Sequence, residues 1–327
     1  MRAVTIPRFG GAEVLEYTEA EAPVPGPGQV AIDVTHAGVN YAEILFRQGA
    51  VDVPLPYVPG IEAAGRIRAL GDGVSGLRVG QSVTALTMTM GGGYGAVAVT
   101  DAHLVAPLPD DADRALMAAV PSNSTTAWLV LGEVARLRKG ERVLVHAAAG
   151  GAGSQLGQVA RLLGAGQVVG TVGSPDKIEA ATAFGYDKVV LRDDLPGAVA
   201  GLTDGRGFDV AVDPVGGAAR RASLDALAQG GRLVAMGNAS GADDVPFSAN
   251  ELWFSGKGVL GFNLGALSGE RPEAVSSVLR QAVGAVLDGE LRVDVGQVLP
   301  LRDATEAHRR LESGRTTGKL VLAMEQE

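Results

Sequence analysis

A glycine-rich segment near the middle of the chain carries the clearest chemical signal. Residues 146–153 read His-Ala-Ala-Ala-Gly-Gly-Ala-Gly. Against the fingerprint G-x-G-x-x-G, Ala148 takes the first position, while Gly150 and Gly153 match the other two. Gly150 would let the backbone approach a pyrophosphate, and Gly153 would let a helix pack closely on a strand. The segment therefore predicts a turn that binds a dinucleotide.

The elements around this turn make the match specific. The apolar run 143–147 has the character of a buried parallel strand, and residues 154–163 follow it with helical spacing. Between them, Gly151 and Ala152 would open a helix whose free N–H groups attract phosphate. Strand and helix patterns then alternate onward, which is typical of βαβ units in a parallel sheet. The expected elements are strands at 168–172, 188–191, 208–213 and 232–237, and a helix at 178–184.

The residues after the second expected strand bear on the choice of nucleotide. NAD sites usually place an acidic residue there to bind the ribose 2′-hydroxyl. Here Ser174 follows the strand, and Lys177 comes about one helical turn later. A hydroxyl and a cation suit a 2′-phosphate, whereas Asp176 argues for a bare ribose and Lys177 could be a solvated helix residue. On balance these residues favour NADPH over NADH.

Composition excludes several other classes. The chain has 327 residues, 46% of them hydrophobic and 4% aromatic, and a net charge of −9. That charge disfavours nucleic acids and anionic membranes as partners. There is no cysteine, so disulfides, thiolate metal sites and a cysteine nucleophile are excluded. No signal-peptide pattern and no apolar run of about 18 residues is present, so we expect a cytoplasmic protein without a membrane span.

The two ends of the chain predict a different pattern of secondary structure from its middle. Residues 1 to about 120 read as short strands between turn signals, for example 30–35, 63–68 and 97–100, which suggests a small β-rich barrel. After the parallel section, two helices and a final strand are expected at 272–288, 303–313 and 319–323. The fold class is therefore α/β, a doubly wound parallel sheet with a β-rich second domain.

Six motifs, in this order, resemble the zinc-independent quinone oxidoreductase (zeta-crystallin-like) branch of the medium-chain dehydrogenase/reductase superfamily. The resemblance covers nearly the whole chain and implies a Rossmann domain at 123–263. It also implies a GroES-like catalytic domain, built from 1–122 and 264–327, and a homodimer. The motifs are the segments 37–43, 56–62, 145–153, 205–217, 236–241 and 314–320.

The resemblance also implies roles for individual residues. Asn40 and Thr126 would lie near the nicotinamide, and Ser174 and Lys177 would meet the 2′-phosphate. The other implied cofactor contacts are Gly237, Asn238, Phe262, Asn263 and Lys319. An ordinary turn-capping role is the alternative for Asn40, and His146 is expected to be packed at a strand end rather than catalytic.

This chain departs from its relatives at several positions. Zinc-dependent relatives carry Gly-His-Glu where it has Gly-Ile-Glu at 60–62, so no metal site is expected. Quinone oxidoreductases often carry a tyrosine before the arginine that corresponds to Arg192, and here that residue is Leu191. The missing tyrosine leaves the details of phosphate recognition and the substrate open.

The expected chemistry is hydride transfer to a substrate that is easily reduced. A quinone or an α,β-unsaturated carbonyl qualifies, since hydrogen bonds alone can stabilise the developing oxyanion or enolate. Asn40 or Tyr41 would donate such a bond, although Tyr41 could equally be core packing. One alternative is an enoyl-thioester reductase acting on enoyl-CoA or carrier-protein substrates. Another is a non-catalytic NADPH-binding protein.

Overall fold

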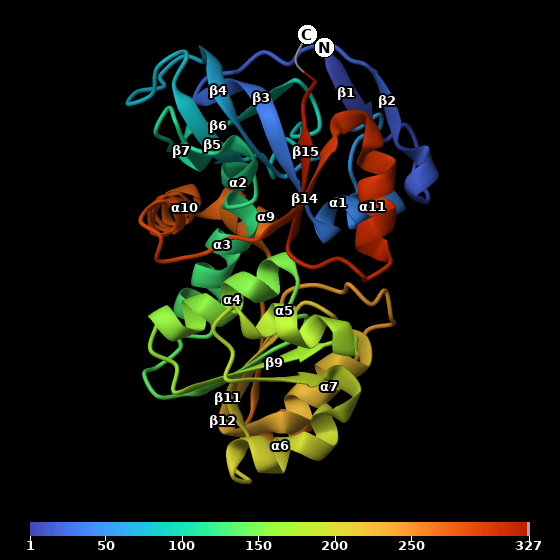
Figure 1. Ribbon diagram of the computed structural model, residues 1–327, viewed down its shortest axis with the longest axis vertical. Coiled ribbons are helices and arrows are strands. Elements are labelled where there is room, and N and C mark those ends of the chain that lie inside the picture. Colours follow the sequence, from blue (N-terminus) through green and yellow to red (C-terminus); the bar gives the residue numbers. More distant parts are fainter. Residues whose placement is uncertain (326–327) are drawn as a thin grey trace. The chain divides into compact units, whose positions relative to one another are not determined.

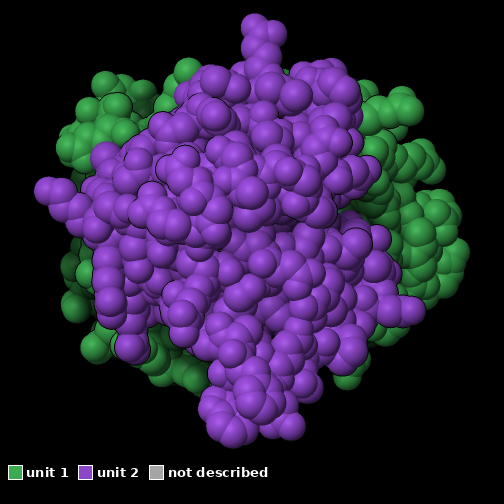
Figure 2. Space-filling view, turned by 90° about the horizontal axis from the view of Figure 1, so that it is seen from below, with its two compact units in different colours: residues 1–125, 264–327 green, residues 126–263 purple. Residues whose placement is uncertain are grey.

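The computed structural model describes residues 1–325, which form two compact units. Unit 1 comprises Met1–Thr125 and Leu264–Glu327, and unit 2 comprises Thr126–Asn263; Figure 2 colours them green and purple. The C-terminal segment joins unit 1 because its last strand, β15 (Lys319–Ala323), pairs antiparallel with β3 (Gln29–Val39). No helix among residues 1–325 has the length and apolar character to cross a bilayer.

Unit 2 is built on a six-stranded parallel sheet, which confirms the predicted doubly wound architecture. Its strand order is β10-β9-β8-β11-β12-β13, so the chain winds outward in both directions from the β8/β11 pair. Open sheets of this kind bind ligands beyond the carboxyl ends of the strands. The strands are β8 (Arg142–Val145), β9 (Gln167–Val172), β10 (Lys188–Leu191), β11 (Phe208–Asp213), β12 (Leu227–Ala235) and β13 (Gly258–Gly261).

Helices cover both faces of this sheet, with α4 and α5 on one face and α6 and α7 on the other (Figure 1). On the face covered by α6 and α7, apolar side chains of the sheet and of these helices form a core around Leu144, Phe208 and Leu233, all of them fully buried. Coverage on both faces explains why the runs 143–145 and 210–212 are apolar rather than alternating. The helices are α4 (Gly151–Leu162), α5 (Ile178–Thr182), α6 (Leu195–Thr203), α7 (Gly217–Ala226) and α8 (Ala249–Ser255).

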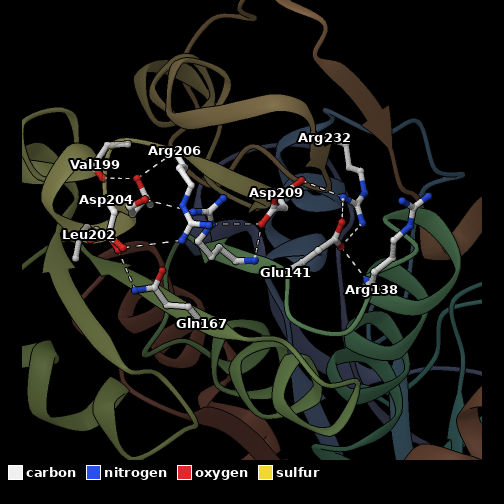
Figure 3. Close-up of polar contacts among 12 residues, drawn as sticks. Arg138, Glu141, Gln167, Val199, Leu202, Asp204, Arg206, Asp209 and Arg232 are labelled. Atoms are coloured by element: carbon white, nitrogen blue, oxygen red, sulfur yellow. Dashed lines mark hydrogen bonds and ion pairs between the residues drawn. The ribbon is translucent and has the colours of Figure 1, made fainter.

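An arginine network closes the amino ends of the unit 2 strands (Figure 3). Arg232 donates to the Glu141 carboxylate at 2.7 and 3.0 Å and to the Asp209 carbonyl at 3.1 Å. The Asp209 carboxylate accepts from the backbone N–H of Arg142 at 2.8 Å. A groove of about 520 Å³ lies beside this network, at the edge of the sheet opposite the carboxyl ends. Its charges are largely paired with one another, which leaves the carboxyl edge of the sheet as the candidate functional site.

Unit 1 is built on a seven-stranded, mainly antiparallel sheet with the order β14-β15-β3-β4-β5-β7, and β6 also pairs with β3. The further strands are β1 (Arg2–Thr5), β2 (Glu16–Glu19), β4 (Glu62–Leu70), β5 (Ser82–Leu86), β6 (Val97–Asp101), β7 (Val105–Pro107) and β14 (Val295–Pro300). The helices are α1 (Tyr41–Gln48), α2 (Arg114–Ala118), α9 (Leu264–Glu270), α10 (Pro272–Leu287) and α11 (Ala304–Glu312), and α3 (Pro121–Trp128) contains the boundary between the units.

A buried polar chain fixes α1 against α11 within unit 1. Arg47 on α1 forms an ion pair with Glu312 and lies 3.5 Å from Nδ1 of His308. An arginine can only donate, so His308 Nδ1 accepts and its Nε2–H donates to the Tyr94 hydroxyl at 3.3 Å. Burial, with a smaller contribution from Arg47, lowers the pKa of His308 to about 3 and keeps it neutral. The start of α1 is thereby held in a fixed place.

Candidate functional site

The glycine turn connects β8 to α4 through a tightly folded backbone. Ala147 adopts a left-handed conformation with φ of 54°, which is costly for an alanine. Its carbonyl oxygen accepts from the Gly150 N–H at 2.9 Å and would lie 2.1 Å from a Cβ at Gly153. Gly153 is therefore required by close packing, as the motif predicts. The turn brings Gly151 and Ala152, the first residues of α4, to the carboxyl edge of the sheet.

Two further glycines let α4 and β9 approach this turn, and sequence reasoning did not single them out. A Cβ at Gly157 would lie 2.3 Å from the Phe184 carbonyl, and one at Gly170 would lie 2.6 Å from Ala148 Cβ. The Tyr186 hydroxyl then closes the back of the turn by donating to the Gly153 carbonyl at 2.5 Å. The glycine turn at 147–153, called the glycine cradle below, thus depends on close contacts with α4, β9 and residues 184–186.

The structure brings most of the predicted cofactor residues of unit 2 to this same edge. Ser174 occupies the N-cap position of the short helix η4 (Pro175–Lys177), two residues after the end of β9. The loop after β12 carries Gly237 and Asn238, and Phe262 and Asn263 follow β13. The Phe262 N–H donates to the Ala235 carbonyl at 3.0 Å. Thr126 is buried on α3, the first residue of unit 2. The residues at the edge are Ser174, Lys177, Gly237, Asn238, Phe262 and Asn263.

A buried carboxylate organises the loops at the centre of this edge. Asp213, the last residue of β11, accepts from the N–H groups of Val215 at 2.7 Å and Gly216 at 3.0 Å. It also accepts from Arg220 at 2.9 Å, and Arg220 in turn donates to the Gly237 carbonyl. This pair ties the loop after β12 to the end of β11. The signal that was missed is an aspartate at the carboxyl end of a parallel strand.

His146 is packed at the end of β8, as expected. The Ser223 hydroxyl donates to the Ala219 carbonyl, so it accepts from His146 Nε2–H at 2.7 Å. His146 Nδ1 then accepts from the Thr171 hydroxyl, also at 2.7 Å. Burial lowers the pKa of His146 to about 4, so the ring is neutral. Both nitrogens are used within the protein.

Two predicted residues of unit 1, Asn40 and Lys319, lie in a buried cluster at the start of α1. Asn40 caps α1, so the capping alternative is part of its role. Its side chain does more, because Nδ2 donates to Glu62 at 2.9 Å and Oδ1 accepts from Lys319. Lys319 is 3% exposed and pairs with Glu62 at 2.5 Å. The opposite hydrogen-bonding characters of lysine and carboxylate fix the orientation of the Asn40 amide.

Glu43, in the first turn of α1, also belongs to this cluster. It accepts from the backbone N–H of Asn40 at 2.8 Å and that of Ile61 at 3.0 Å, and it is fully buried. Burial, with a smaller contribution from the charge of Glu62, raises the pKa of Glu43 to about 7, although Lys319 and the Ile61 N–H oppose the rise. Sequence reasoning passed over Glu43, yet its spacing from Asn40 is that of a capping box. The cluster therefore places two carboxylates against one lysine.

Lys319 and Tyr41 also have defined surroundings in unit 1. The resemblance implies that Lys319 approaches the cofactor, and the structure places its ammonium on Asn40 and Glu62. Tyr41, the first residue of α1, is half-buried. Burial, with the charge of Glu312, raises the pKa of Tyr41, so its hydroxyl keeps its proton at neutral pH. Within residues 1–325, no group of three or more His, Asp or Glu side chains is arranged to hold a metal.

Comparison with known proteins agrees with this geometry. Residues 26–110 match the alcohol dehydrogenase GroES-like domain, and residues 184–322 match the zinc-binding dehydrogenase family model. A probable quinone oxidoreductase of Schizosaccharomyces pombe is 35% identical over 98% of this chain and 96% of its own length. The quinone oxidoreductase of Pseudomonas aeruginosa is 34% identical over 96% of this chain and 97% of its own.

A solved structure extends the similarity to three dimensions. The Escherichia coli quinone oxidoreductase complexed with NADPH superposes with a TM-score of 0.90 at 30% identity, covering 99% of this chain and all of that one. The similarity thus runs through both units. The chain belongs to the quinone oxidoreductase branch of the medium-chain dehydrogenase/reductase superfamily.

Proposed function

We propose that this enzyme uses NADPH to reduce a quinone or an α,β-unsaturated carbonyl. The observation that carries the proposal is the carboxyl edge of unit 2, where the glycine cradle lies beside Ser174 and Lys177. The backbone at Gly153 has no room for a side chain, and the first turn of α4 presents its N–H groups at the same edge. A pyrophosphate with a phosphorylated ribose fits this set of donors.

The two units take different parts in the proposed reaction. Unit 2 is the Rossmann domain that holds the cofactor, and unit 1 is the catalytic domain. When bound, NADPH supplies the hydride. Of the two predicted donors, Asn40 or Tyr41, the Asn40 amide donates to Glu62 and Glu43, so Tyr41 donates the hydrogen bond to the substrate oxygen, where negative charge develops. Tyr41 is suited to donating because its hydroxyl stays protonated. Thr126, Gly237, Asn238, Phe262 and Asn263 line the nicotinamide end.

A steady-state assay of cofactor oxidation tests this function directly. We expect turnover of quinones or enones with NADPH, and at least a tenfold lower kcat/KM with NADH, because the 2′-phosphate adds charge-assisted hydrogen bonds. The panel includes enoyl-CoA thioesters. Preference for those thioesters would support the enoyl-thioester reductase alternative instead, and tight NADPH binding without turnover on the whole panel would contradict an enzymatic role on these substrates.

We also propose that the chain forms a homodimer through the outer edge of the unit 2 sheet. Strand β13 ends the sheet, so one side of its backbone has no partner strand among residues 1–325. Just before it, Trp253 and Phe254 stack at 4.7 Å between ring centroids and are 74% and 78% exposed. Exposed aromatic pairs beside a free strand edge are typical of protein interfaces.

The oligomeric state is measured by analytical ultracentrifugation. The chain has a mass of 33.3 kDa, and the wild-type protein is expected to sediment at about twice that mass. The variant Leu260→Asp places a charge on β13 and is expected to sediment as a monomer. A monomeric wild type, or a variant that remains dimeric, would contradict this interface. The cytoplasmic location stays a prediction from composition.

A further inference from the structure

The loop after β12 carries two of the residues proposed to line the nicotinamide end, Gly237 and Asn238. Residues 236–248 form neither helix nor strand, and residues 239–244 are exposed. The only apolar side chains from 237 to 244 are two alanines. Apolar packing therefore contributes little to the position of this loop, and polar contacts must hold it in place.

Backbone contacts join the loop to the residues that follow β11. The N–H groups of Ala239 and Ser240 donate to the carbonyls of Pro214 and Val215, at 3.1 and 2.8 Å. A Cβ at Gly237 would lie 2.8 Å from the Pro214 carbonyl, so glycine is needed for this close approach. The loop after β12 is thus positioned by the loop after β11.

One side chain, that of Arg220 on α7, contacts both loops. Its Nε donates to Asp213 at 2.9 Å, and its Nη2 donates to the Gly237 carbonyl. Its Nη1 lies 3.6 Å from Asp244, whose side chain is 88% exposed, so this outer pair contributes little. The Arg220 side chain is only 12% exposed, and Asp213 is fully buried. The planar guanidinium therefore fixes the Gly237 carbonyl relative to the end of β11.

The strand order of unit 2 separates this contact from the adenosine end of the proposed cofactor site. Strands β9 and β12 lie on opposite sides of the β8/β11 pair. Ser174 follows β9, whereas Gly237 follows β12. A displacement of the loop after β12 should therefore affect the nicotinamide half of a bound dinucleotide and leave its adenosine half in place.

We propose that Arg220 is a positioning residue that holds Gly237 and Asn238 where the nicotinamide half of the cofactor binds. The inference rests on the proposed use of NADPH, and Arg220 acts through the Gly237 carbonyl. Reacting atoms must approach to about 3–3.5 Å, and a misplacement of about 1 Å lowers the rate about 100-fold. Loss of Arg220 should therefore lower kcat more than it weakens binding.

Isothermal titration calorimetry with NADPH and with 2′,5′-ADP, which lacks the nicotinamide, tests the inference alongside steady-state kinetics. Arg220→Met removes both inner contacts. Because it leaves the buried Asp213 carboxylate without its cation, Arg220→Met combined with Asp213→Asn is measured as well. In both variants we expect kcat to fall about tenfold or more and the Kd of NADPH to rise about threefold or more, while the Kd of 2′,5′-ADP changes less than about twofold. The matched control is Arg221→Met, since Arg221 is the next residue and its more exposed side chain pairs with Asp225 and Glu251.

Each outcome decides between the claims. If kcat and the Kd of NADPH in the double variant match those of the control, or if the Kd values of NADPH and 2′,5′-ADP rise equally, the role of Arg220 is overturned and the proposed function stays intact. A wild type that binds NADPH but reduces no quinone or enone overturns the proposed reaction, and the difference between the two Kd values then decides the role of Arg220 alone. A wild type that does not bind NADPH overturns both.

Discussion

Replacing Lys319 with Met is expected to destabilise unit 1 by about 3–5 kcal/mol, because it leaves buried carboxylates without their cation. Glu62 is fully buried, and besides Lys319 the Asn40 amide and the Ser122 N–H donate to it, at 2.9 and 2.7 Å. Glu43 lies in the same cluster. A loss of this size would lower the Tm by about 10 °C. Both tryptophans, Trp128 and Trp253, belong to unit 2, so unfolding should be followed by circular dichroism.

A double variant separates this structural role from direct cofactor binding. In Lys319→Met with Glu62→Gln, no unpaired carboxylate remains at position 62, so we expect roughly half of the lost stability to return. If Lys319 acts through Asn40, the KM for NADPH should recover in step with stability. A KM that stays high in a double variant of restored stability would instead show that Lys319 contacts the cofactor, as the family resemblance implies.

The sheet of unit 2 could be predicted because the sequence patterns that specify its strands, helices and glycine turn lie within short segments of the chain. Each strand is a short apolar run, each helix has its own spacing, and the glycine turn is written in consecutive residues. The need for glycine at 153 follows from a contact with Ala147, only six positions earlier. Sequence patterns with a fixed period report such short-range geometry directly.

The polar clusters could not be predicted in the same way, because their members come from distant segments. Lys319 meets Asn40 across 279 positions, and only the pairing of β15 with β3 brings them together. Arg220 reaches Gly237 through the register of two parallel strands, which the apolar runs do not specify. Burial of a charged residue depends on the whole fold, so Glu43 reads in sequence as an ordinary surface acid.

The buried carboxyl of Glu43 is expected to make the stability of unit 1 fall as the pH rises. Its pKa is about 7 in the folded protein, against an ordinary value of 4.5. Between these values the folded state binds a proton that the unfolded state does not, so the free energy of unfolding decreases with pH. The contribution is complete below pH 4.5, amounts to about 3 kcal/mol, and is lost as the pH passes 7.

The comparison with Glu43→Gln isolates this contribution, since glutamine cannot titrate. Buried His308 and His146, whose pKa values are lowered to about 3 and 4, act in the opposite direction, but both proteins carry them and their contributions cancel. We therefore expect the stability of wild type relative to Glu43→Gln to fall by about 3 kcal/mol from pH 4.5 to 7.5 in urea denaturation followed by circular dichroism. Glu16→Gln on the surface strand β2 controls for the loss of one carboxyl. A difference that stays constant with pH would mean that Glu43 is ionised throughout and that Lys319 fully compensates two buried carboxylates.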